Sequence, residues 1–322
     1  MAREAFELLR KNGYQAKVLT ITAKEKLCLC EEMECNPVNC PYAKGHYDRV
    51  NDAVFSLLQK EDMITREVIL EQAKEYNVCP FEMCLDTATW VDDIICDYNY
   101  VFDPNVYLKR FFADGTTGDY IFLVDEAHNL VERSREMYSA IIYKEDFLLA
   151  KKILKKYGQA KLMRELEKCN RVLLSYKREC EKYVIYESIG NFAFELMNVA
   201  SDLDEFLQKA PEFPERKDLS EFYLNLRNFL NIYELLDDHY VVYAEHEQDG
   251  RFKLKLYCVD PSKNLQERIN KGNATIFFSA TLLPVGYYKS LLSTETDNYA
   301  VYAKTAFREE QKLLLLGNDV SS

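Results

Sequence analysis

The chain has 322 residues, of which 48% are hydrophobic and 29% charged, and this length is enough for two or three domains with separate cores. Its few glycines (10) and prolines (8) favour a helix-rich fold over an all-β one, and the absence of an apolar run of about 18 residues excludes a helical membrane span. The net charge of −12 argues against a protein that coats nucleic acid but is compatible with a narrow basic channel. The charged N-terminus is unlike a signal peptide, so we expect a cytoplasmic protein.

Short apolar strands separated by helices are predicted in the first part of the chain. A cysteine-rich, turn-containing block lies between the first strand and the second, and the second ends in a proline-punctuated turn. The expected strands occupy residues 16–22 and 119–124, and residues 92–104 contain a further expected strand and its turn. The expected helices occupy residues 2–12, 48–60, 66–76 and 106–112.

The second half of the chain has a different pattern. Residues 144–238 are almost free of glycine and proline and carry apolar residues at helical spacing, which predicts a bundle of four or more helices with breaks near Gly158, Gly190 and residues 210–215. Residues 240–260 alternate on both sides of Asp249-Gly250, which predicts a β-hairpin, and a fourth apolar strand follows at 274–281. We therefore expect an α/β protein whose sheet is interrupted by a cysteine-rich insertion and a helical one.

Two adjacent carboxylates, Asp125 and Glu126, follow the strand that ends at residue 124. The carboxyl edge of a parallel sheet is where α/β proteins bind ligands. One carboxylate there can hold Mg²⁺ on nucleotide phosphates while the next polarises an attacking water. An Asp-Glu pair after a strand is also a common helix cap, so the signal depends on its combination with the later segment FFSATLLP at 277–284.

Seven of the ten cysteines lie before residue 97, and this clustering indicates a metal site in a chain kept under reducing conditions. An iron–sulfur cluster requires four converging thiolates. A four-cysteine zinc site is the alternative, although only Cys35 and Cys40 approach the paired spacing that is typical of zinc. We expect Cys96, Cys169, Cys180 and Cys258 to be small buried apolar residues.

Four segments together resemble one helicase family. VDEAHN at 124–129 resembles the DEAH-box Walker B motif of superfamily 2 helicases, and SATLLP at 279–284 resembles motif III of the XPD/DinG family of iron–sulfur helicases. CDYNYVFDP at 96–104 resembles the segment before the DEAH strand, and LTITAKEKLC at 19–28 resembles the segment that leads into the cluster domain. These segments occur in the family's order and extend over nearly the whole chain.

The resemblance implies a partial RecA-like parallel sheet, the first motor domain of a helicase, with an inserted helical iron–sulfur domain and an inserted, mainly helical Arch domain. The implied boundaries are 1–23, 86–133 and 271–290 for motor domain 1, 24–85 for the cluster domain, 134–270 for the Arch-like domain with its hairpin, and 291–322 for the start of motor domain 2.

The resemblance also implies roles for single residues at the nucleotide site. Asp125 would coordinate Mg²⁺, Glu126 would be the general base of ATP hydrolysis, and His128 would couple the nucleotide to motif III. Ser279 and Thr281 would relay the state of the nucleotide to DNA. Mg-ATP is thus the implied nucleotide of the complete protein.

A 4Fe-4S cluster and single-stranded or forked DNA are the other implied ligands. The contexts of the family's cysteines assign the cluster to Cys28, Cys35, Cys40 and Cys79, with Cys30 and Cys84 left open as replacements. Basic and aromatic side chains around these cysteines are the expected DNA contacts, namely Lys24, Lys26, Tyr42, Lys44 and Arg49, with His46 and Tyr47 beside them.

The sequence contains no G-x-x-x-x-G-K-[ST] motif, the phosphate-binding loop expected of the family. We therefore expect an internal fragment of an ATP-dependent 5′–3′ DNA helicase that acts in repair or recombination, without most of the second motor domain and inactive as an ATPase on its own. The alternative is a non-catalytic module that binds nucleic acid or protein and holds a structural four-cysteine metal site. A two-metal nuclease or hydrolase built on Asp125 and Glu126 would need further acidic partners, which the sequence does not offer at a recognisable spacing.

Overall fold

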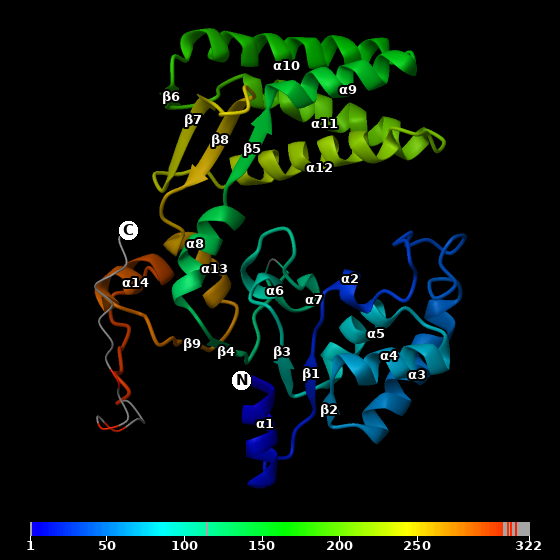
Figure 1. Cartoon of the computed structure of the whole chain (residues 1–322), viewed down its shortest axis with the longest axis vertical. Coiled ribbons are helices and arrows are strands. Elements are labelled where there is room, and N and C mark those ends of the chain that lie inside the picture. The colour runs from blue at the N-terminus through cyan, green and yellow to red at the C-terminus, as the bar shows by residue number, and fades with distance from the viewer. Residues whose placement is uncertain (1, 114, 305–307, 309, 311–312, 314–322) are drawn as a thin grey trace. The chain divides into compact units, whose positions relative to one another are not determined.

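The structure, a computed structural model, describes residues 2–113, 115–304, 308, 310 and 313 (Figure 1). The chain divides into two compact units, Met1–Leu108 and Lys109–Ser322. Within the described residues, no helix is both long enough and apolar enough to cross a lipid bilayer.

The first unit contains a three-stranded parallel sheet. Its central strand β1 (Val18–Thr20) pairs on one side with β2 (Met63–Ile64) and on the other with β3 (Asp93–Ile95). Val18 and Leu19 are buried, as expected of a central parallel strand that is covered on both faces. The helices of this unit are α1 (Ala2–Lys11), α2 (Lys24–Leu27), α3 (His46–Lys60), α4 (Arg66–Tyr76), α5 (Pro80–Thr87), the 3₁₀ helix η1 (Ala88–Trp90) and α6 (Asn99–Phe102).

Helices α3, α4 and α5 pack together beside this sheet because each carries an apolar stripe. Along α3 the buried residues Val50, Ala53, Val54 and Leu57 follow the spacing of one helical face. The buried Gln72 of α4 donates its amide N–H to the Ala53 carbonyl at 2.9 Å, so this polar side chain is satisfied.

The second unit begins with α7 (Lys109–Phe112) and contains two parallel strands, β4 (Ile121–Val124) and β9 (Ala274–Phe277), paired from Ile121–Ala274 to Val124–Phe277. The rings of Phe112, Tyr120 and Phe122 pack edge to face beside this pair. Gly272 lies so close that an added Cβ would be 2.8 Å from both the Phe122 ring and the Tyr120 carbonyl oxygen. A glycine is therefore required where the chain enters β9.

Between β4 and β9 lies a large helical insertion with its own sheet (Figure 1). Its four-stranded antiparallel sheet has the order β5-β8-β7-β6. Buried side chains from the helices and the sheet, among them Phe147, Leu203, Phe229 and Phe252, form one continuous core. The elements are β5 (Ala140–Tyr143), α9 (Lys144–Lys156), α10 (Ala160–Glu179), β6 (Tyr183–Tyr186), α11 (Phe192–Lys209), α12 (Arg216–Tyr233), β7 (Tyr240–His246) and β8 (Phe252–Cys258).

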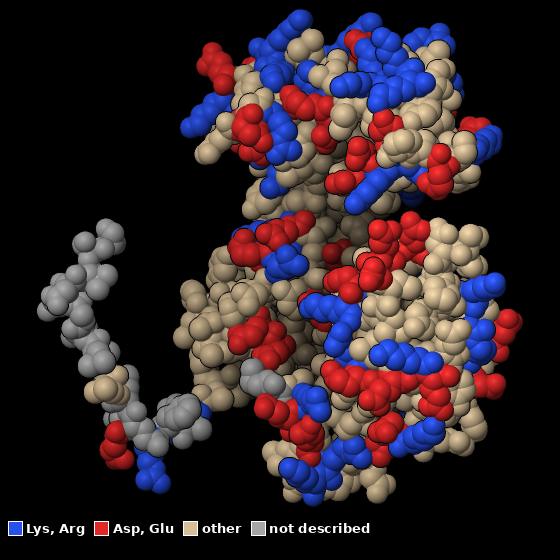
Figure 2. Space-filling model, turned by 45° about the vertical axis from the view of Figure 1, so that its right-hand side comes forward, with Lys and Arg blue, Asp and Glu red and all other residues tan. Residues whose placement is uncertain are grey.

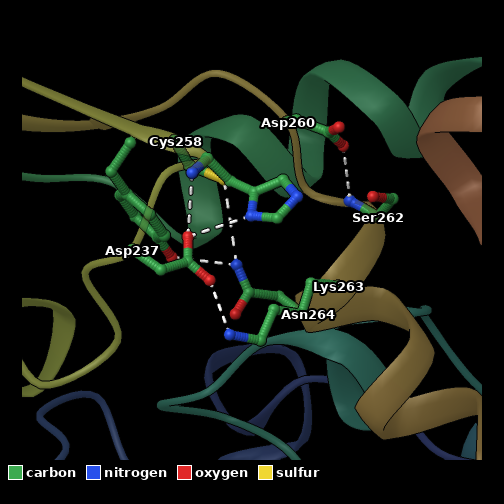
Figure 3. A network of polar contacts seen from close by, with 8 residues as sticks. Asp237, Cys258, Asp260, Ser262, Lys263 and Asn264 are labelled. Carbon is green, nitrogen blue, oxygen red and sulfur yellow. Dashed lines mark hydrogen bonds and ion pairs between the residues drawn. The ribbon is translucent and has the colours of Figure 1, made fainter. Parts of the chain in front are cut away.

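Two helices join the insertion to the β4–β9 pair: α8 (His128–Met137) leads out of β4 and α13 (Ser262–Ile269) leads back to β9, which is followed by α14 (Val285–Leu292). A polar network ties α13 to the base of the β7–β8 hairpin (Figure 3). The Lys263 ammonium donates to Asp237 at 2.6 Å, and the Asn264 amide donates to the Tyr240 hydroxyl at 2.9 Å. The base of the hairpin and the start of the path to β9 are thus held together.

The predicted helical bundle and the β-hairpin are confirmed, with four helices broken near Gly158, Gly190 and residues 210–215. The four apolar strands are also confirmed but are shorter than expected, and residues 99–102 form a helical turn (α6) where we expected strand and turn. The parallel strands form two sheets, one in each unit, so the architecture shown is α/β with separate parallel and antiparallel sheets. The finer assignment to RecA-like and Arch domains, with its boundaries, stays a prediction.

Candidate functional site

The loop after β4 is held against the loop after β9 by backbone hydrogen bonds. Phe278 N–H donates to the Val124 carbonyl at 3.0 Å, and Ala127 N–H donates to the Phe278 carbonyl at 3.2 Å. Between these two bonds Glu126 adopts a left-handed conformation with φ of +48°. This region is unfavourable for a residue with a Cβ, and residues held there concentrate at functional sites. The turn lets the chain reverse into α8 immediately after the strand.

This turn brings four of the predicted site residues into one hydrogen-bonded network around the Ser279 hydroxyl. Its oxygen lies 2.8 Å from Nδ1 of His128, donates to Oε2 of Glu126 at 3.1 Å and accepts the Thr281 N–H at 3.2 Å. His128 Nδ1 also lies 3.1 Å from Glu126 Oε2. The network therefore links residues that are more than 150 positions apart in the sequence.

Asp125 lies beside this network and is not a member of it. Its Oδ1 accepts the Glu126 N–H at 2.8 Å, and among the described residues its Oδ2 has no hydrogen-bond partner. The Glu126 side chain is 50% exposed and that of His128 is 30% exposed, so solvent and small ligands can reach both. The site offers one carboxylate oxygen for a cation and a second carboxylate fixed by a hydroxyl and an imidazole.

A second candidate site lies in the first unit, where five cysteines line a cavity of about 210 Å³. They are the predicted ligands Cys28, Cys35, Cys40 and Cys79 together with Cys30. The sulfur atoms of Cys30 and Cys40 are 3.8 Å apart. Burial, together with the neighbouring Cys40 and Cys28, raises the pKa of Cys30 to about 11, so a metal would have to displace its proton.

Other cysteines do not contribute to this cavity. Cys84 is fully buried with its sulfur 4.0 Å from the Thr20 carbonyl oxygen, and burial raises the pKa of its thiol to about 12. Cys169, Cys180 and Cys258 are buried as expected, whereas Cys96 is half-buried. Among the cysteines that the structure describes, the candidate metal ligands are therefore the four predicted cysteines and Cys30.

Five thiols in one cavity do not form a compact single-ion site. Two thiolates on one tetrahedral zinc lie about 3.8 Å apart, since Zn–S bonds are about 2.3 Å long. The sulfur atoms of Cys30 and Cys40 have this separation. In the part of the chain that the structure describes, no three side chains of His, Cys, Asp or Glu converge closely enough to hold one metal ion.

His46 also lines the cysteine cavity, which agrees with its expected position around these cysteines, but its burial was not expected. We expected it among the DNA contacts, but it is only 4% exposed at the start of α3. Its Nδ1 accepts the backbone N–H of Cys79 at 3.2 Å, whereas its Nε2 has no partner among the described residues. Burial lowers the pKa of His46 below its ordinary value.

The structure separates the predicted DNA contacts into three groups. Lys24 and Tyr42 line the cysteine cavity, and the Lys24 ammonium lies 5.7 Å from the centre of the Phe81 ring. The guanidinium of Arg49 donates to three backbone carbonyls, those of Lys44, Tyr76 and Asn77, which gives it a structural task. Lys26 and Lys44 are exposed.

Basic and acidic side chains are interspersed on the face of the molecule that Figure 2 shows, so a nucleic-acid contact there would rest on a few local cations.

Comparisons with known proteins identify part of the chain. Residues 8–148 match the family model DEAD_2. The Regulator of telomere elongation helicase 1 homolog from Anopheles gambiae is 26% identical over 128 residues, which are 39% of this chain and 12% of that protein. A solved chain described as XPD_Helicase is similar with 18% identity and a TM-score of 0.46 over 87% of this chain and 48% of its own length. A solved chain described as Truncated XPD is similar with 19% identity and a TM-score of 0.49 over 90% of this chain and 80% of its own length.

The match to the curated relative extends over about an eighth of that protein. The family match over residues 8–148 includes the cysteines of the cavity and the Asp125-Glu126 loop. Residues 8–148 thus match the DEAD_2 family, and part of the chain is similar to a regulator of telomere elongation helicase.

Proposed function

We propose that this chain is part of an ATP-dependent DNA helicase that carries an iron–sulfur cluster and moves 5′ to 3′ along single-stranded DNA in repair or recombination. The observation that supports this most is the Ser279 network, because it joins the Asp-Glu-Ala-His segment after β4 to the Ser-Ala-Thr segment after β9. A nucleotide bound at one loop would be sensed by the other through shared hydrogen bonds.

In this proposal the residues at the end of β4 divide the chemistry of ATP hydrolysis. Asp125 would hold Mg²⁺ through its Oδ2, and the cation would neutralise charge on the phosphates. Glu126 would accept the proton of the attacking water, and the Ser279 hydroxyl and the His128 imidazole orient its carboxylate for that task. Thr281 completes the link to the β9 loop through its N–H.

The chain does not contain the G-x-x-x-x-G-K-[ST] loop that cradles the phosphates in such enzymes, and we therefore expect no ATP hydrolysis by this chain alone. The assay is phosphate release from Mg-ATP with and without single-stranded DNA, and Glu126→Gln is the matched control. Phosphate release that disappears in Glu126→Gln would contradict this expectation.

The cysteine cavity would hold a 4Fe-4S cluster. The residues present fit such a group, because five thiols line the cavity and the buried N–H of His46 needs an acceptor that sulfur can provide. Cys28, Cys35, Cys40 and Cys79 would be the ligands, with Cys30 as the possible replacement of Cys40, its close neighbour. The cluster would supply a rigid crosslink among segments that are far apart in the sequence.

DNA binding would use the exposed cations near the cavity, Lys26 and Lys44. The test is fluorescence anisotropy with single-stranded and duplex oligonucleotides at several salt concentrations, for the parent chain and a Lys26→Ala/Lys44→Ala variant. We expect a salt-dependent preference for the single strand that weakens in the variant. A chain that binds neither oligonucleotide would favour the alternative function, a non-catalytic module that binds protein.

A further inference from the structure

The imidazole of His46 is placed against the cysteine cavity by its surroundings. Gly45, with φ of +68°, starts α3 in a left-handed conformation, and an added Cβ would lie 2.6 Å from the Arg49 guanidinium. Arg49 in turn donates to the carbonyls of Lys44 and Asn77, at 2.8 and 2.6 Å. The segments that carry His46 and Cys79 are therefore clamped to each other.

The hydrogen bond from Cys79 fixes which nitrogen of His46 carries the proton. Nδ1 accepts the Cys79 N–H, so it presents its lone pair to the backbone. In a neutral imidazole the other nitrogen is then the N–H donor. Nε2 of His46 consequently has no lone pair with which to bind a metal, and its only polar capacity is to donate a hydrogen bond.

That donor has no acceptor among the described residues, although it is fully shielded from solvent. Leaving a buried N–H unpaired costs about 1–3 kcal/mol. Such groups in native proteins nearly always have a partner. His46 lines the same cavity as the five cysteines, and a negatively charged sulfur is a suitable acceptor.

We propose that Nε2–H of His46 donates a hydrogen bond to a sulfur atom of the cysteine-held iron–sulfur group in this cavity. His46 is thus a positioning residue: it holds the Cys79 backbone through Nδ1 and the group through Nε2. The inference rests on the proposed cluster and adds a prediction about its redox behaviour. Hydrogen bonds to sulfur stabilise the reduced, more negative state and raise the reduction potential.

The experiment compares anaerobically purified parent chain, His46→Phe and His46→Gln. The phenylalanine keeps a ring of similar size without a donor, and the glutamine places an amide N–H near the position of Nε2. His246→Phe is the matched control, because it makes the same substitution at an exposed histidine of the hairpin. The readouts are iron and acid-labile sulfide per chain, the visible spectrum and the midpoint potential.

We expect His46→Phe to retain the group at a more negative potential, His46→Gln to recover a potential close to that of the parent, and His246→Phe to change nothing. If His46→Phe loses its iron, retention by His46→Gln supports the donor role, whereas loss from both variants overturns it in favour of ring packing. Equal potentials in the loaded parent and His46→Phe overturn the inference and leave the proposed cluster intact. A parent chain without iron and sulfide overturns the proposed cluster itself, and the inference with it.

Discussion

Replacing Ser279 with alanine tests whether its hydroxyl joins the two loops at the ends of β4 and β9. The substitution removes the partner of His128 at 2.8 Å, of Glu126 at 3.1 Å and of the Thr281 N–H at 3.2 Å. Each neutral hydrogen bond contributes about 0.5–1.5 kcal/mol, and bonds to a carboxylate contribute more. Because the Glu126 side chain is half exposed, water replaces part of the lost hydrogen bonding. We therefore expect the substitution to lower the free energy of local opening by about 1–2 kcal/mol in total.

This magnitude is measurable as hydrogen exchange at the Thr281 amide. A loss of about 1–2 kcal/mol corresponds to exchange that is roughly 5–30 times faster. Ser290→Ala is the matched control, because it removes a hydroxyl whose one partner among the described residues is the Tyr287 carbonyl within α14. Unchanged protection of Thr281 in Ser279→Ala, or the same acceleration in both variants, would refute the network as the link between the loops.

Three further predictions concern stability. Gly272→Ala forces a Cβ to within 2.8 Å of an aromatic ring and a backbone oxygen, so thermal unfolding should show a loss of about 1–3 kcal/mol, whereas Gly286→Ala, with nothing within 4 Å, should lose none. Burial and the facing Asp202 carboxylate raise the pKa of Glu165, so its charged form destabilises the fold above that pKa and the cost disappears as the pH falls through it. Glu165→Gln should therefore raise the unfolding temperature at pH 7 but not below the ordinary pKa of 4.5, and an equal gain at both pH values would contradict this explanation. Phe229→Ala removes a fully buried ring from the core of the helical insertion and should cost about 3–5 kcal/mol in chemical denaturation of that region, so a loss below about 1 kcal/mol would contradict the core assignment.

Local patterns were sufficient to predict the elements whose stability is local. The Asp249-Gly250 turn marked the hairpin because Gly250 adopts a positive φ of 86°, and apolar spacing marked the four long helices. Strands β5 and β6 were missed because they pair only with residues of β8 and β7 far along the chain. Their residues are mostly β-branched or aromatic, but each strand has only four residues and is therefore too short to stand out from the helical pattern beside it.

The candidate site could be predicted only in part for the same reason. Residue types and order indicated Glu126, His128 and Ser279, but the left-handed turn at Glu126 has no signal in the sequence. The role of His46 depends on a backbone N–H 33 positions away. Arg49 looked like a phosphate ligand, whereas its donors are used by backbone carbonyls that only the fold brings to it.

The most direct test of the proposed function is the iron, acid-labile sulfide and zinc content of anaerobically purified protein, measured for the parent chain and for single replacements of Cys28, Cys35, Cys40, Cys79 and Cys30 by serine. We predict about four irons and four sulfides per chain with a broad visible absorption band, and a loss of both in the ligand variants. One zinc per chain without sulfide would contradict the iron–sulfur helicase and favour a binding module with a structural metal.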